Sequence, residues 1–223
     1  MPVPKFLIYQ PDENAPAGAI QDELSSLRCA STLVRCDKHQ PASFDPEVYS
    51  GLIVLGGGKK SADTRGRYVT EKNCTHQAVT HGKPVFGVCL RAQLLALECG
   101  GGQRRSTCIV DKGWKNVILT RAGTTDPVLK HLKQGERMYQ YHYDWSILPT
   151  TTAIKELAKS SDAGVEHCEA FRFGNSYGVQ FHPEVTKEIL DAWKVKELPE
   201  DSLRTGRRMI NAWIRLAIGE VAA

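Results

Sequence analysis

Short apolar runs alternate with longer stretches of helical spacing along the first hundred residues of this chain. Four of the runs predict buried strands: KFLIY (5–9), STLVRC (31–36), YSGLIVLGGG (49–58) and KPVFGVC (83–89). Three other stretches predict helices: 18–30, 65–81 and LRAQLLALECGGG (90–102). Strands that alternate with helices in this way are typical of βαβ units, so we expect a parallel sheet with helices on both faces.

The pattern changes in the second half of the chain. Residues 103–119 and 165–181 form strand-like runs without long helices between them. The tail, 202–219, places its apolar residues along one helical stripe: Leu203, Met209, Ile210, Trp213, Leu216 and Ala217. No repeat or low-complexity linker interrupts the sequence. We therefore expect residues 1–223 to form a single α/β domain, an open, mostly parallel twisted sheet flanked by helices, with a small antiparallel extension.

Composition and charge exclude several classes of function. Hydrophobic residues at 41% and charged residues at 24% are ordinary for a globular protein, and a net charge of +4 without a long basic block does not predict nucleic-acid binding. No window approaches the roughly 18 apolar residues that span a bilayer, and the start, MPVPKFLIYQ, does not resemble a signal peptide, so we expect no membrane partner. The seven cysteines are scattered without a CxxC pair, which predicts no zinc site and a reducing, cytoplasmic environment.

Cys89 occupies the junction between a predicted buried strand and a predicted helix. A sharp strand-to-helix turn lifts a nucleophile out of the sheet, and Gly87 relieves the crowding at such a turn. The free N–H groups and the dipole at a helix N-terminus lower the pKa of a thiol and can hold an oxyanion. The competing interpretation is that Cys89 is a small core residue, because free cysteine is among the most buried residue types.

A base for such a thiol is available at the end of the strand-like run NSYGVQFHPE (175–184). His182 ends this run, Pro183 fixes the backbone, and Glu184 follows close enough to orient the imidazole. Taken alone, His-Pro-Glu also fits a strand end before a helix. The three glycines at 56–58 are either a tight turn or a source of backbone N–H groups for a developing negative charge.

Together these motifs resemble the class I glutamine amidotransferases, whose glutaminase domains carry a Cys-His-Glu triad. The family pattern G-x-C-x-G-x-Q corresponds to GVCLRAQ (87–93), and its later H-P-E corresponds to HPE (182–184). The stretches KGWKNVILT, YQYHYDWSILP and SYGVQFHPEVTKEILDAW are similar to a stand-alone subgroup that resembles the GMP synthetase glutaminase domain. The resemblance covers nearly the whole chain and implies a flavodoxin-like class I glutamine amidotransferase fold.

The resemblance also implies a role for each motif residue. Cys89 would attack the side-chain amide of glutamine, giving a γ-glutamyl thioester and ammonia, while His182 moves the proton and Glu184 orients His182. The other implied substrate or oxyanion contacts are Gly57, Gly58, Leu90, Gln93 and His142. No cofactor and no metal are implied.

Three departures from the family pattern surround the implied glutamine pocket. Arg91 replaces the glycine two residues after the cysteine, Gly58 is followed by two lysines where the family has proline, and His142-Tyr143-Asp144 replaces H-G-D. Arg91, Tyr143 and Asp144 are therefore candidate specificity residues. Arg91 either meets a carboxylate on a γ-glutamyl compound other than glutamine or points to solvent.

Three functions remain open from the sequence. The first is a glutaminase that passes ammonia to a separate synthetase chain, since the ATP-binding signature GxxxxGK[ST] is absent. The second is a γ-glutamyl hydrolase that acts on γ-glutamyl conjugates. The third is a catalytically silent subunit that binds a partner. The expected small-molecule partner of the first two is glutamine or another γ-glutamyl compound.

Overall fold

The computed structural model describes residues 2–35, 43–57, 65–105, 111–162 and 165–220. Its first half alternates strands and helices as the sequence predicts. The elements are β1 (Lys5–Gln10), α1 (Ala19–Ser26), β2 (Ala30–Arg35), β3 (Gly51–Val54), α3 (Arg65–Thr80), β4 (Val85–Val88) and α4 (Leu90–Glu98). Helix α1 is shorter than predicted because Leu27 caps it and Arg28 takes the left-handed conformation, with φ 55°, before the chain enters β2.

The second half consists mainly of strands and closes on two helices. Its strands are β5 (Gly102–Arg105), β6 (Asp111–Asn116), β7 (Ile118–Leu119), β8 (Arg137–His142), β9 (Asp144–Ile147), β10 (Ile154–Asp162), β11 (Val165–Phe173) and β12 (Ser176–Val179). Its helices are α5 (Arg121–Thr124), the 3₁₀-helix η1 (Leu129–His131), α6 (Lys187–Ala192) and α7 (Glu200–Ala217).

Ten of the described strands join in one sheet. The order along the sheet is β2-β1-β3-β4-β12-β11-β10-β7, with β9 paired to β11 and β5 paired to β9. The neighbours from β2 to β12 are parallel, and the pairings beyond β12 are antiparallel. Strands β6 and β8 form a separate antiparallel pair. This topology confirms the predicted open, mostly parallel sheet with an antiparallel extension.

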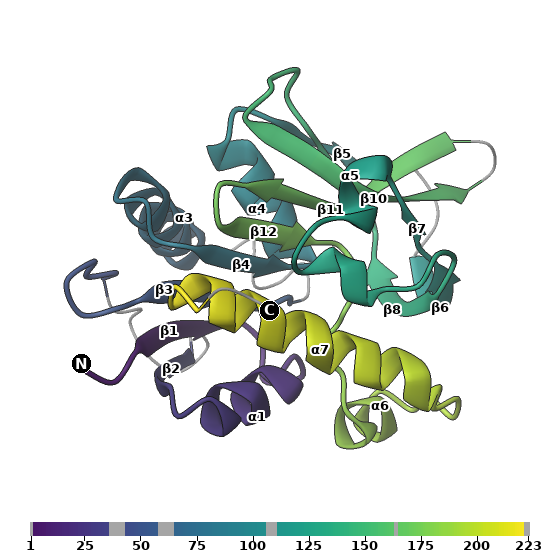
Figure 1. Ribbon diagram of the computed structural model, residues 1–223, viewed down its shortest axis with the longest axis horizontal. Coiled ribbons are helices and arrows are strands. Elements are labelled where there is room, and N and C mark those ends of the chain that lie inside the picture. The colour runs from purple at the N-terminus through teal and green to yellow at the C-terminus, as the bar shows by residue number, and fades with distance from the viewer. Residues whose placement is uncertain (1, 36–42, 58–64, 106–110, 163–164, 221–223) are drawn as a thin grey trace.

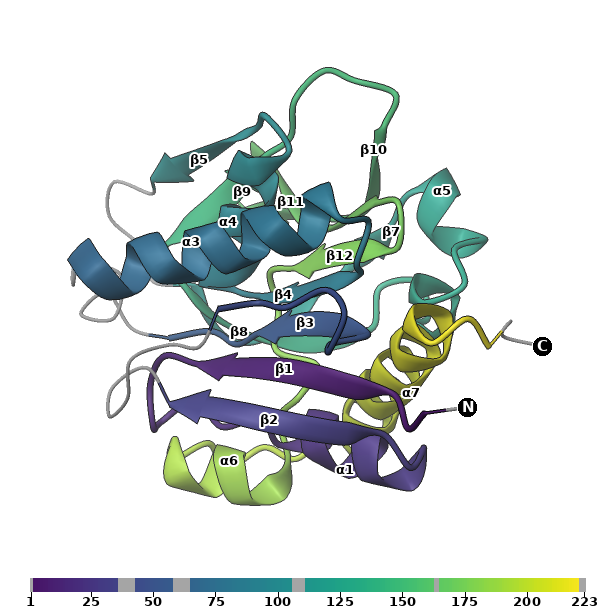
Figure 2. The ribbon, with the colours of Figure 1, turned by 90° about the vertical axis from the view of Figure 1, so that its left-hand side faces the viewer.

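Helices cover both faces of the parallel strands (Figures 1 and 2). On one face, alternate strand residues such as Phe6 and Phe86 pack against α1 and α7, with Trp213 of α7 in ring contact with both phenylalanines. On the other face, Leu7 and Leu52 belong to the cluster that α3 and α4 complete. Because both faces are buried, the strands read as continuous apolar runs in the sequence.

The carboxyl ends of β1, β3, β4 and β12 meet at one edge of the sheet, where parallel α/β sheets carry their ligand sites. Helices α1 and α7 hold the chain that leaves β12. A Cβ on Gly206 would lie 2.3 Å from the carbonyl oxygen of Pro183, and a Cβ on Gly18 would lie 2.2 Å from that of Glu184. The amide of Ala19 donates to the same Glu184 oxygen at 3.0 Å. The helices thus fix the backbone of the His-Pro-Glu motif.

Among the described helices, none combines the length and the hydropathy that a bilayer crossing requires.

Candidate active site

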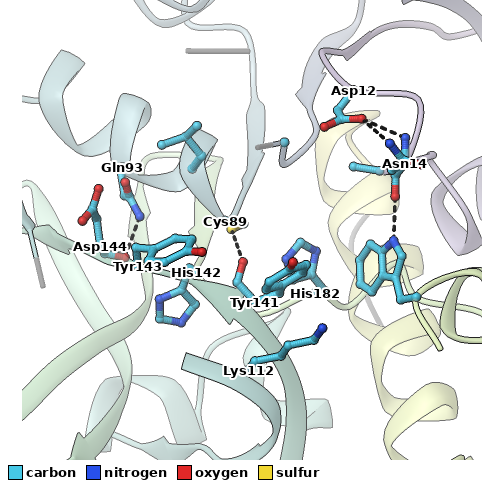
Figure 3. A pocket seen from close by; sticks show the side chains of 14 residues that line it. Asp12, Asn14, Cys89, Gln93, Lys112, Tyr141, His142, Tyr143, Asp144 and His182 are labelled. Atoms are coloured by element: carbon cyan, nitrogen blue, oxygen red, sulfur yellow. Dashed lines mark hydrogen bonds between the residues drawn. The ribbon is translucent and has the colours of Figure 1, made fainter. Parts of the chain in front are cut away.

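Cys89 is the single residue between strand β4 and helix α4. It has φ 56° and ψ −115°, a conformation that a non-glycine residue rarely adopts and that is frequent at functional sites. A Cβ on Gly87 would lie only 2.6 Å from the carbonyl oxygen of Arg91, so the tight turn requires glycine there. The amide of Cys89 donates to the Val179 carbonyl at 2.8 Å and ties the turn to β12. The thiol donates to the Tyr141 carbonyl at 3.5 Å (Figure 3).

His182 is buried and is held by a carboxylate. Its Nδ1 lies 2.7 Å from Oε1 of Glu184, which is 1% exposed, and its amide donates to the Tyr139 carbonyl at 2.9 Å. Burial alone would lower the pKa of His182, but the charge of Glu184, its hydrogen bond to Nδ1 and the nearby Cys89 outweigh burial, so the pKa is raised above 6.5. These interactions favour the charged, imidazolium form of the ring.

Gly56, at the end of β3, lies against both of these side chains. A Cβ at this position would be 3.1 Å from Cε1 of His182 and 3.3 Å from Cβ of Cys89. The thiol and the imidazole therefore sit next to one another beneath the glycine turn. Trp193 closes the other side of the imidazole, edge-on at a centroid distance of 5.3 Å.

A pocket of about 510 Å³ opens over the thiol (Figure 3). The sequence-predicted residues that line it are Cys89, His182, Gly57, Leu90, Gln93, His142, Tyr143 and Asp144. Glu184 lies behind His182, as its hydrogen bond requires. Gly58 lies outside the described residues. The structure thus brings together the motif residues from β3, α4, β8, β9 and the end of β12.

Arg91 is placed elsewhere, and this corrects the expectation that it faces the substrate or solvent. Its side chain is 0% exposed and its Nη2 lies 2.5 Å from Oε2 of Glu71, a residue of α3 that is also fully buried. Arg91 does not line the pocket. The arginine sits on the face of α4 that packs against α3, so it neither crowds the pocket nor offers a cation to a substrate carboxylate.

Gln93 is anchored by a network of amide hydrogen bonds. Its Nε2 donates to the Asp144 carbonyl at 2.7 Å and to Oε1 of Gln180 at 3.1 Å, and its Oε1 accepts from Gln103 at 2.7 Å. Gln103 also donates to Oδ2 of Asp144 at 2.9 Å. Gln93 therefore joins helix α4 to strand β9 as well as lining the pocket.

Several lining residues were not found by the sequence analysis: Asp12, Asn14, Ala15, Lys112, Tyr141 and Trp193. Asp12 and Asn14 follow the carboxyl end of β1. Because parallel α/β sheets bind ligands at the carboxyl ends of their strands, this position could have indicated them. Lys112 reaches the pocket because β6 pairs with β8 opposite Tyr141, and its Nζ lies 4.6 Å from the Tyr141 ring centroid. Trp193 donates through Nε1 to the Asn14 carbonyl at 2.7 Å. Lys112 and Trp193 lie in stretches that carry the family resemblance, KGWKNVILT and SYGVQFHPEVTKEILDAW, but belong to neither catalytic motif.

The other described cysteines are poor candidates for a nucleophile. Burial raises the pKa of their thiols above the usual value: Cys29, Cys74, Cys168 and, to about 11, Cys99. A protonated thiol is a weak nucleophile at neutral pH. Cys36 and Cys108 lie outside the described residues. Within the described ranges, no three His, Cys, Asp or Glu side chains group as a metal site would need.

The thiol lies on a strand–helix turn at the carboxyl edge of a doubly wound sheet, beside an imidazole that a carboxylate holds. This arrangement defines a class of α/β proteins equipped for acyl transfer. Within that class the assignment is specific. Residues 17–196 match the family Glutamine amidotransferase class-I, and the chain belongs to this family.

Comparison with individual proteins agrees with this assignment. The chain is 31% identical over 148 residues to one subunit of the glutamine-hydrolyzing GMP synthase of Sulfurisphaera tokodaii, in an alignment that covers 64% of this chain and 72% of that protein. It is 28% identical over 215 residues to the putative glutamine amidotransferase-like protein YfeJ of Salmonella typhimurium, covering 93% and 86%. A glutamine amidotransferase structure from Thermotoga maritima superposes with a TM-score of 0.80 over 98% of this chain and 99% of its own, at 19% identity, which shows a shared fold.

Proposed function

We propose that this chain hydrolyses the side-chain amide of glutamine through a γ-glutamyl thioester on Cys89 and releases glutamate and ammonia. The observation that carries the proposal is the buried arrangement of Cys89, His182 and Glu184 at one pocket. An imidazole held by a carboxylate can take the proton of a neighbouring thiol, and the thiolate so formed is the reactive form of a cysteine nucleophile.

In the first step the thiolate attacks the γ-carbonyl carbon and its electrons form the S–C bond. The carbonyl oxygen becomes an oxyanion, for which the backbone N–H groups of Gly57 and Leu90 are the proposed donors. Both residues line the pocket, and Leu90 is the first residue of α4, where amides lack helical partners. His182 gives its Nε2 proton to the nitrogen as the C–N bond breaks, so ammonia leaves and the thioester remains.

In the second step water replaces ammonia. His182, now neutral, takes a proton from the water, whose oxygen attacks the thioester carbonyl. The tetrahedral intermediate collapses with loss of the thiolate, and glutamate leaves with the water oxygen in its side-chain carboxylate. Glu184 keeps the Nδ1 proton in place throughout, because its Oε1 accepts from Nδ1 at 2.7 Å and leaves Nε2 for the reaction.

We infer further that a separate chain uses the ammonia. The Sulfurisphaera tokodaii relative is, by its name, one subunit of a GMP synthase. A comparable arrangement here would place the acceptor-activating chemistry in a partner chain.

A second candidate, hydrolysis of a γ-glutamyl conjugate, is favoured by one observation. The pocket volume of about 510 Å³ is within the range that holds drug-sized ligands and exceeds what a single glutamine fills. The same thiol chemistry would then release an amine other than ammonia.

One assay separates these candidates. Purified protein is incubated with glutamine and with a panel of γ-glutamyl amides, and the release of glutamate, ammonia and amine is measured. Cys89→Ala is run beside Cys99→Ala, a matched control outside the pocket. Release of ammonia from glutamine that only Cys89→Ala abolishes supports the glutaminase. Turnover confined to the conjugates supports the hydrolase, and full turnover by Cys89→Ala refutes both.

A further inference from the structure

Behind the pocket, a chain of three buried or half-buried side chains leads away from His142. Nε2 of His142 lies 2.9 Å from Oε1 of Gln140, and Nε2 of Gln140 donates to Oε2 of Glu169 at 2.8 Å. Oε1 of the same carboxylate accepts from the Ser160 hydroxyl at 2.6 Å. Gln140 is 0% exposed, Glu169 1% and His142 4%, so water does not compete for these bonds.

The direction of this chain is set at the carboxylate. Both Gln140 and Ser160 donate to Glu169, so Gln140 turns its NH₂ group towards the carboxylate. The amide oxygen of Gln140 then faces His142. An oxygen accepts, and Nε2 of His142 must therefore carry a proton. With Nε2 protonated, a neutral ring has its lone pair on Nδ1.

Electrostatics keeps this ring neutral. Burial and then the charge of His182 lower the pKa of His142 to about 3, with His167 adding to the effect and the Asp144 backbone opposing it. Both imidazoles line the pocket at which Cys89 lies. Two imidazolium rings there would repel each other, and the charge on His182 is the one the thiolate needs.

We propose that Gln140 and Glu169 are positioning residues that hold His142 as the neutral Nε2–H tautomer, so that His182 carries the only imidazolium charge among the described residues that line the pocket. They touch no substrate and act through His142. The assignment of the tautomer does not depend on the proposed function. The effect of the tautomer on turnover rests on the proposed function.

Nitrogen-15 NMR of the histidine rings at neutral pH tests the tautomer directly, with His142→Gln identifying the signals. The expected spectrum shows a protonated Nε2 and an unprotonated Nδ1 for residue 142. A protonated Nδ1, which a protonated Glu169 would impose by reversing the chain, overturns the proposal, and so does a doubly protonated ring. This measurement needs no turnover, so it fails separately from the proposed function.

Variants test the relay, by which we mean the hydrogen-bonded chain from Glu169 through Gln140 to His142. Glu169→Gln removes the fixed acceptor and lets Gln140 rotate, so we expect a mixture of the two His142 tautomers. The double variant Gln140→Glu/Glu169→Gln restores an acceptor next to Nε2 and is expected to restore the Nε2–H signal. Glu166→Gln is the matched control, because Glu166 lies on the same strand with its side chain 69% exposed and paired to Lys159. An unchanged tautomer in folded Glu169→Gln overturns the relay.

The kinetic consequence follows from the tautomer. In Glu169→Gln the Nδ1–H tautomer of His142 replaces part of the Nε2–H population, and we expect kcat/KM for glutamine to fall about tenfold relative to Glu166→Gln. A changed His142 tautomer in Glu169→Gln with kcat/KM equal to that of the wild type would overturn the positioning role. It would show that Gln140 and Glu169 set the tautomer without serving turnover.

Discussion

Replacing Arg91 by methionine removes one half of a fully buried ion pair and leaves the other half in place. Arg91 and Glu71 are each 0% exposed, so losing the guanidinium leaves the carboxylate of Glu71 buried without this opposite charge. Breaking a buried pair in this way costs about 3–5 kcal/mol of unfolding free energy. For a chain of this size that corresponds to a fall in Tm on the order of 10 °C.

The loss of unfolding free energy depends on how deeply the ion pair is buried rather than on the distance between its atoms. A second ion pair of this chain provides a matched control. Arg137 and Glu197 are also 2.5 Å apart, but their side chains are 45% and 51% exposed. Arg137→Met is therefore expected to cost about 0–1 kcal/mol. The double variant Arg91→Met/Glu71→Leu removes both buried charges, and we expect it to recover most of the stability that Arg91→Met loses.

Urea-induced unfolding followed by circular dichroism measures all four proteins under the same conditions. The expected order of stability is wild type and Arg137→Met highest, the double variant near them, and Arg91→Met lowest. If Arg91→Met is no less stable than Arg137→Met, the reasoning is refuted, since Arg91 would then have access to solvent. If the double variant recovers the unfolding free energy, the loss in Arg91→Met comes from the uncompensated charge of Glu71 and not from lost packing around Arg91.

Three further outcomes are expected at the pocket. Gly56→Ala places a methyl group 3.1 Å from His182 and 3.3 Å from Cys89, so kcat for glutamine should fall roughly ten- to a hundredfold while the protein stays folded; an unchanged kcat would contradict the geometry. Glu184→Gln removes a charge that raises the pKa of His182, so the imidazolium is lost at lower pH and the alkaline limb of the pH–rate profile should move down; a limb that stays in place would contradict this. The pKa of His142 is lowered to about 3 in the folded state from 6.5, so the unfolded state binds the extra proton between these values. The unfolding free energy should fall as pH drops from 6.5 towards 3, by up to about 1.4 kcal/mol per pH unit from this group; His142→Gln should show a shallower fall, and an equal one would refute the assignment.

The parallel half of the fold could be predicted because its signals are local. Each of the first four apolar runs became a strand, and the stripe that includes Met209, Ile210 and Trp213 became the buried face of α7. The end of α1 was predicted too late in the chain, because Arg28 reverses the chain through a left-handed conformation. A single residue that turns the chain leaves no periodic signal.

The antiparallel part could be predicted only in outline. Strands β8 to β10 lie between the two strand-like runs that the pattern indicated, and their place in the fold depends on pairings with distant residues. Lys112 and Trp193 join the pocket through such pairings and contacts, so the sequence around each residue does not place it at the pocket.

The motif residues could be predicted because GVCLRAQ and HPE resemble two motifs of the class I glutamine amidotransferases. Cys89, His182 and Glu184 come together at the sheet edge as the motifs imply. Arg91 could not be placed from the sequence, because the direction of its side chain depends on Glu71 in a helix that the pattern does not pair with α4.

The central claim is that Cys89 carries the γ-glutamyl group during turnover. The most direct measurement is acid quenching of the protein during reaction with glutamine, followed by peptide mass spectrometry to locate a bound glutamyl group, with Cys89→Ser as the control. We expect the group on the peptide that contains Cys89, released by hydroxylamine and absent from the variant. Turnover that persists in Cys89→Ser, or a glutamyl group on any other residue, would contradict the account.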